Sequence, residues 1–169
     1  ADNICGGSSR FTGSQGSSVL KLFGLTAAST GINEKAAQTA GIAYDKVVLF
    51  PASHAAYYPG AQSMAMKVLY EKESLRLLGA QIVGGEGVDK RIDILATAIR
   101  AKMTALELTE LDLSYAPPYS SAKDPVNMAG FMIEDLESGN VRPFHWNDVE
   151  DLPCADSATL LDVRPAWGD

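Results

Sequence analysis

The proline pair Pro117-Pro118 constrains the fold of this chain more than any other feature. Each proline ring fixes the backbone angle φ and lacks an N–H, so neither a helix interior nor a central strand can run through the pair. Tyr115 and Tyr119 flank the prolines, and Asp124-Pro125 then suits the N-cap and first position of a helix. The sequence therefore predicts a stiff loop that presents tyrosines ahead of a helix. Such a loop is either a functional site or a packed turn, and the residues leave both open.

Apolar residues at helical spacing predict the longest helix over residues 88–102, after a glycine-rich turn. Its charged residues are expected on the opposite face, in solvent: Asp89, Lys90, Arg91, Asp93 and Arg100. The first four could equally form a charge network at a subunit contact. Capping signals predict three further helices: residues 34–40 after Asn33, a short one opened by a Thr104–Glu107 capping box, and residues 125–137 closed by Gly139.

Alternating or β-branched apolar runs predict strands over residues 19–25, 46–50, 64–71 and 75–84. The last two are expected to pair as an antiparallel hairpin with one packed face. The small, polar run at residues 26–31 is expected to be a loop. Because strands and helices follow one another without regular βαβ alternation, the sequence predicts an α+β fold, with an antiparallel sheet and helices packed on one side.

Composition narrows the choice of partners and compartment. The chain has 169 residues and a formal net charge of −7. The length suits one globular domain with tails, and the negative charge argues against nucleic acid and anionic membrane as partners. We find no apolar run long enough to span a bilayer and no secretory signal at the start, so a cytoplasmic protein is expected.

The sequence offers no complete catalytic constellation of its own. Residues 84–87, Gly-Gly-Glu-Gly, lack the G-x-G-x-x-G spacing of a dinucleotide fingerprint and are expected to form a plain strand-to-helix turn. His54 and His145 have no carboxylate or cysteine at ligand spacing, which argues against a metal site. Cys5 lies in a Gly/Ser-rich segment and Cys154 in an acidic one, so neither is expected to be a nucleophile. Any chemistry must be completed by residues from elsewhere.

Five segments resemble, in order, the motifs of one family: residues 25–31, 54–60, 79–84, 87–93 and 115–127. They include His-Ala-Ala-Tyr-Tyr-Pro-Gly at 54–60 and Tyr-Ala-Pro-Pro-Tyr at 115–119. The family is the C-terminal dimerisation domain of FAD-dependent pyridine nucleotide–disulfide oxidoreductases, and the chain is similar specifically to its coenzyme A-disulfide reductase branch, often labelled NADH oxidase. The likeness spans residues 17–139.

The resemblance implies a homodimer whose parent enzyme uses FAD and NAD(P)H to reduce a coenzyme A disulfide, persulfide or polysulfide. Each dimerisation domain would cover the active site of the other subunit. Tyr57 and Tyr115 match the family's functional tyrosines and would hydrogen-bond or protonate the thiolate that leaves. The main chain at Ala116 and Pro117 would lie near the partner's flavin. No cofactor is expected on this chain alone, and the chain alone is not expected to be active.

The resemblance also implies a division of the chain. Residues 1–17 would be a linker stub from a flavin domain, 18–140 the dimerisation domain, 141–157 a linker, and 158–169 the truncated start of a rhodanese-like domain. Two alternatives stay open: the same domain from an NADH oxidase or peroxidase, or a purely structural module that self-associates.

Overall fold

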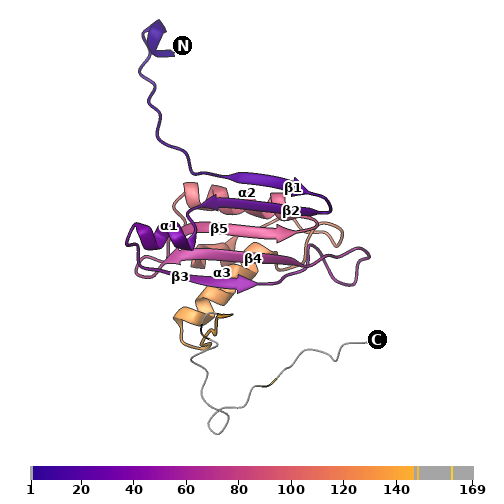
Figure 1. The fold of residues 1–169 in the computed structure, drawn as a ribbon. Helices are drawn as coiled ribbons and strands as arrows, with labels where there is room; N and C mark the ends of the chain where they lie inside the picture. Colours follow the sequence, from indigo (N-terminus) through magenta and orange to yellow (C-terminus); the bar gives the residue numbers. More distant parts are fainter. Residues whose placement is uncertain (1, 147, 149–160, 162–169) are drawn as a thin grey trace.

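The computed structural model describes residues 2–146, 148 and 161, and they form one sheet with helices packed against it (Figure 1). All five strands pair antiparallel, in the spatial order β1-β2-β5-β4-β3. The strands are β1 (Ser18–Leu22), β2 (Leu25–Gly31), β3 (Tyr44–Leu49), β4 (Met64–Glu71) and β5 (Leu77–Gly84). The helices are α1 (Glu34–Thr39), α2 (Val88–Arg100) and α3 (Pro125–Glu137), with 3₁₀ turns η1 (Asp2–Cys5) and η2 (Leu106–Glu110). The predicted α+β class is confirmed.

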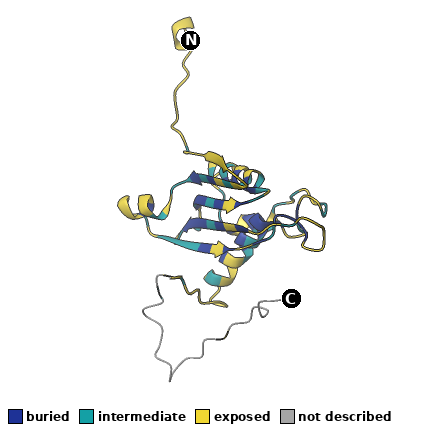
Figure 2. Ribbon diagram, turned by 45° about the vertical axis from the view of Figure 1, so that its right-hand side comes forward, coloured by how far each residue is buried: buried dark blue, intermediate teal, exposed yellow. Residues whose placement is uncertain are grey.

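The core lies between the sheet and the helices α2 and α3, which cover the same face (Figures 1 and 2). Period-two alternation along β4 turns Met64, Met66 and Val68 to that face, where they are buried. From α2, Ile92 and Leu95 pack into the same cluster. No described helix has the length and apolar character needed to cross a membrane.

The capping residues predicted from the sequence define the observed helix ends. The Asn33 side chain accepts a hydrogen bond from the Ala36 N–H at the start of α1. Asp124 and Asn127 form a reciprocal capping box at the start of α3. The Thr104–Glu107 box is also present, although the turn that follows it is 3₁₀ rather than α-helical.

The prediction of a loop over residues 26–31 was wrong, because these residues form most of β2. β2 is an inner strand, paired with β1 on one side and β5 on the other. Its inward side chains Ala28 and Thr30 are small and buried, and α2 packs across them. Small residues in this strand let the helix approach closely, so the segment lacks the bulky apolar alternation that normally identifies a strand.

Residues 15–17 are attached to the folded domain, whereas residues 6–14 are exposed. The Gln15 side-chain amide donates to Thr30 Oγ1 at 2.9 Å and to the Ala96 carbonyl at 3.0 Å. Ser17 Oγ lies 2.8 Å from Thr30 Oγ1. The proposed linker at 1–17 stays a prediction. Cys154, the linker expected at 141–157 beyond residues 141–146 and 148, and the rhodanese-like start expected at 158–169 apart from exposed Leu161 fall outside the described residues.

Glu34 connects α1 to the sheet face opposite α2. Its carboxylate lies 2.6 Å from Lys46 Nζ and 2.7 Å from Lys67 Nζ, on neighbouring strands. Burial disfavours the charged carboxylate, but the hydrogen bonds and charges of the two lysines outweigh that cost and lower the pKa of Glu34 from 4.5 to about 2. Glu34 therefore makes the domain sensitive to acid.

Acidification from about pH 5 to about pH 2 is expected to remove about 0.5–2 kcal/mol of stability through these two partly exposed ion pairs. The folded-state pKa lies below the unfolded one, so the contribution is complete above pH 4.5 and is lost as the pH falls toward 2. Urea unfolding of the native chain and of Glu34→Gln at both pH values measures it. The difference in free energy of unfolding between the two proteins should be smaller at the lower pH. An equal difference at both pH values would contradict this role of Glu34.

Candidate functional site

Two loops meet at one end of the sheet, on the right in Figure 1. One joins β3 to β4 and carries Tyr57, and the other joins η2 to α3 and carries Tyr115. The Ala55 N–H donates to the Ser120 carbonyl at 3.0 Å and so ties the loops together. The predicted stiff loop is therefore one half of a two-loop structure.

Tyr57 and Tyr115 lie side by side, with their hydroxyl oxygens 3.1 Å apart. Both rings reach solvent, since Tyr57 is 76% exposed and Tyr115 48% exposed. The hydrogen bond between the two hydroxyls, in which either oxygen can be the donor, raises the pKa of Tyr115 above its ordinary value of 10. Tyr115 therefore keeps its proton at neutral pH, and a phenol O–H of the pair can donate to a group that approaches from outside.

The proline pair forms a tight turn next to Tyr115. The Ala116 carbonyl accepts hydrogen bonds from the N–H groups of Tyr119 (2.9 Å) and Ser120 (3.1 Å), which closes the turn around Pro117 and Pro118. Ala116 and Pro117 are half-buried, and the Tyr119 ring is exposed. The four predicted site residues thus lie in one patch.

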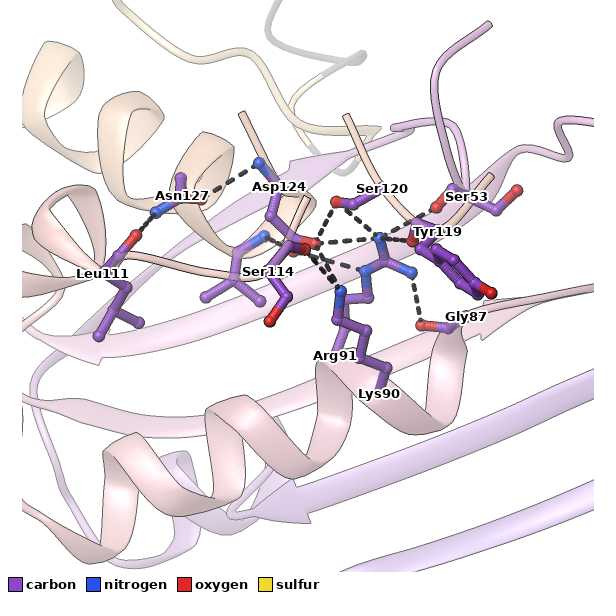
Figure 3. Close-up of polar contacts among 11 residues, drawn as sticks. Ser53, Gly87, Lys90, Arg91, Leu111, Ser114, Tyr119, Ser120, Asp124 and Asn127 are labelled. Atoms are coloured by element: carbon purple, nitrogen blue, oxygen red, sulfur yellow. Dashed lines mark hydrogen bonds and ion pairs between the residues drawn. The ribbon is translucent and has the colours of Figure 1, made fainter. Parts of the chain in front are cut away.

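Arg91 lies beneath the two loops, and its predicted place on a solvent-exposed face was wrong (Figure 3). The side chain is 1% exposed and forms an ion pair with Asp124, which is 2% exposed, with Nη2 and Oδ2 3.0 Å apart. Position 91 belongs to the buried stripe of α2, at helical spacing from Val88 and Leu95. That spacing is the sequence signal for its burial, and the charge obscured it.

A cleft of about 810 Å³ opens beside the tyrosine pair. Tyr115 and Ala116 form part of its wall, together with side chains of both charge signs from the β1–β2 hairpin and α2: Lys21, Asp89 and Lys90. Among the described residues, no group of three potential ligands could hold a metal ion. The described part of the cleft can bind and orient a polar molecule, and its wall offers the aliphatic hydroxyls of Thr26, Ser53 and Ser114 as well as phenols.

In the part of the chain that the structure describes, neither histidine forms a hydrogen bond with Tyr57 or Tyr115. His54 is buried, with Nδ1 3.2 Å from the Ala55 carbonyl oxygen, and its ring meets Tyr58 edge-on at 5.7 Å between centroids. His145 lies after α3, where its N–H donates to Asp148 Oδ2 at 2.8 Å. The phenols carry the donor chemistry of this patch.

The glycine-rich turn before α2 does not form a phosphate cradle. A Cβ atom on Gly85 would overlap the Gln62 side chain, and one on Gly87 would overlap the Arg91 guanidinium. Gly87 is also the N-cap of α2, with φ +71°. These glycines make room for side chains of the protein itself, which confirms the prediction of a plain strand-to-helix turn.

Residues 18–125 match the family model described as pyridine nucleotide-disulphide oxidoreductase, dimerisation domain. The coenzyme A disulfide reductase of Staphylococcus haemolyticus is 43% identical over 126 residues, which are 75% of this chain and 28% of that protein. The chain therefore spans less than a third of the length of this relative.

Two solved structures are similar over most of the chain. Reduced CoADR-RHD of Bacillus anthracis superposes with a TM-score of 0.84 at 46% identity, covering 89% of this chain and 27% of that one. A NAD-dependent persulfide reductase from A. fulgidus superposes with a TM-score of 0.81 at 44% identity, covering 83% of this chain and 26% of that one.

Proposed function

Because the chain belongs to the dimerisation-domain family of pyridine nucleotide-disulphide oxidoreductases, we propose that it is the self-associating part of a homodimeric enzyme that reduces a disulfide or persulfide of coenzyme A. The relatives named above support that substrate class. The single observation on this chain that carries the proposal is the exposed Tyr57–Tyr115 pair, with its hydroxyls 3.1 Å apart beside a cleft. Both phenols belong to one chain, so a single dimerisation domain presents them together to the partner subunit.

The role of the pair is to supply a proton to sulfur. When a disulfide is attacked by a thiolate, one sulfur leaves as a thiolate, and a nearby O–H stabilises or protonates it. One hydroxyl of the pair donates to the other, and the second proton is free to point outward. The raised pKa of Tyr115 keeps the Tyr115 hydroxyl protonated above neutral pH. An NADH oxidase or peroxidase needs no donor to a leaving thiol, so the pair favours the disulfide substrate.

The cofactors of the parent enzyme would be FAD and NAD(P)H, held by domains that these residues do not include. Once bound there, they would supply the redox chemistry that reduces a redox cysteine of the parent enzyme. This chain would contribute the main chain at Ala116 and Pro117 near the flavin of the partner, since both lie on the same turn as Tyr115. The division at residues 17, 140 and 157, and a place in the cytoplasm, belong to the same proposal.

In the full-length enzyme, Tyr57→Phe combined with Tyr115→Phe is expected to slow disulfide turnover about 100-fold, the lower range for loss of a general acid. Stopped-flow reduction of the flavin by NAD(P)H should keep its native rate, because that step needs no proton for sulfur. Unchanged disulfide turnover would remove the catalytic role. Tyr119→Phe is the matched control, since its exposed ring lies on the same loop and outside the pair.

A mixed dimer tests whether the tyrosines act across the subunit contact. One subunit carries both Phe substitutions, and the other has its redox cysteine replaced by serine. If the tyrosines serve the partner's site, one site of the mixed dimer combines intact tyrosines with an intact cysteine, and about half the native activity should return. No recovery would place the tyrosines in the site of their own subunit.

A further inference from the structure

We propose that Arg91 is a positioning residue that fixes the two loops against each other and thereby holds Tyr57 and Tyr115 at hydrogen-bonding distance. The proposal rests on the function proposed above for the pair. Arg91 comes from α2, a rigid element, whereas both tyrosines come from loops. A helix that holds two loops through one side chain can keep two exposed phenols at a fixed distance from each other.

The guanidinium of Arg91 bonds to each loop (Figure 3). Nη2 donates to the Ser53 carbonyl at 2.9 Å, in the loop that carries Tyr57. The same nitrogen lies within donor distance of three acceptors of the other loop and the start of α3: the Tyr119 carbonyl (3.3 Å), Ser120 Oγ (3.2 Å) and Asp124 Oδ2 (3.0 Å). Nη1 donates to the Gly87 carbonyl at 3.2 Å, which fixes the guanidinium to its own helix.

Short hydrogen-bonded paths lead from this network to each tyrosine. On one side, the Ser120 N–H donates to the Ala116 carbonyl, so the residue that touches Arg91 also sets the turn next to Tyr115. On the other side, Ala55 lies two residues after Ser53, and its carbonyl accepts from the Tyr58 N–H and so closes a turn around Tyr57. Displacement of the guanidinium would therefore disturb both turns at once.

Only arginine has the geometry for this role. Its planar fork carries five donors and reaches acceptors of the two loops and of Asp124 at once, whereas the lysine ammonium is a point charge with three donors. Within the described residues, every buried side-chain nitrogen or oxygen has a hydrogen-bond partner. A lysine at this position would leave some of these acceptors without a donor in a dry site.

The titration of Tyr115 reports the distance between the two hydroxyls. The bond to Tyr57 is the main reason why the pKa of Tyr115 is raised. We would label the tyrosines of this 169-residue chain with ¹³C at Cζ and follow Tyr115 by NMR from neutral to alkaline pH. Tyr57→Phe removes the partner hydroxyl, and it should move the titration of Tyr115 down toward 10, which defines the signature of a separated pair.

Arg91→Lys is expected to reproduce that signature, with the upward shift of Tyr115 lost although both tyrosines are present. The control is Leu95→Ala, one turn along the same helix, which destabilises the core without touching the loops. It should leave the titration of Tyr115 at its native value. A folded Arg91→Lys protein with the native Tyr115 titration would overturn the proposal.

A second variant guards against loss of the fold. Arg91→Met with Asp124→Asn removes both charges and keeps a residue that can cap α3, and it should also separate the tyrosines. If both variants unfold, the network serves the stability of the whole domain and the proposal is overturned. The Tyr115 titration is measured without turnover, so it tests the positioning role separately from the proposed function. If the Arg91 variants separate the tyrosines but the Phe substitutions leave disulfide turnover unchanged, the proposed function is wrong and the positioning role stands.

Discussion

Replacing Arg91 by methionine is expected to lower the free energy of unfolding by about 3–5 kcal/mol, the usual loss when one partner of a buried ion pair is removed. The carboxylate of Asp124, 2% exposed, would lose its counter-ion and could neither reach water nor find another full partner. Lys90 Nζ, at 3.8 Å from Asp124 Oδ2, offers only a weak substitute. Urea denaturation followed by circular dichroism measures the loss.

Two variants show whether that loss comes from the buried pair. Arg100→Met changes the same residue type at the exposed end of the same helix and should alter stability by less than about 0.5 kcal/mol. Adding Asp124→Asn to Arg91→Met removes the uncompensated charge and should recover part of the stability. A double variant less stable than Arg91→Met alone would contradict the account.

Gly31→Ala is expected to cost about 2–5 kcal/mol, from two separate sources. Gly31 has φ +67°, where an alanine is strained by about 1–2 kcal/mol. Its added Cβ would also overlap the Leu78 carbonyl on the neighbouring strand, and crowding of this kind costs about 1–3 kcal/mol. The backbone cannot move away easily, because the Ile32 N–H donates to that same carbonyl at 3.0 Å.

Gly41→Ala separates the two sources. Gly41 has the same φ of +67°, but a Cβ there would meet nothing within 4 Å. It should therefore cost only the strain, about 1–2 kcal/mol. Equal losses at the two glycines, measured by urea denaturation, would show that the contact with Leu78 has no cost and that the sheet gives way there.

Local chemistry allowed most of the fold to be predicted. Asn33 and Asp124 cap helices in the structure as expected, because a cap depends on residues within one turn. The β4–β5 hairpin was predicted for a similar reason, since alternation and a short connection both act locally. The strand β2 was missed, because its small residues fit against α2, a helix that lies far along the chain.

For the candidate site, the sequence suggested single residues and not how they meet. Resemblance proposed Tyr57 and Tyr115 separately, whereas their contact joins residues 58 positions apart and depends on how two loops pack. Arg91 was assigned to the wrong face, because charge was weighed above position within the apolar stripe of α2. An arginine at a stripe position is a cue for a buried counter-ion, and Asp124 was already recognised as a helix cap.

Asp124 caps α3 and is also the counter-ion of Arg91. Because one side chain has both roles, positions 91 and 124 are coupled in evolution. Asparagine at 124 could still cap α3 but carries no charge to pair with Arg91. Glutamate carries the charge but is not among the preferred N-cap residues. No single-step replacement at 124 satisfies both neighbours. A lineage that changes this corner of the domain must therefore change positions 91 and 124 together or pass through a weakened ancestor.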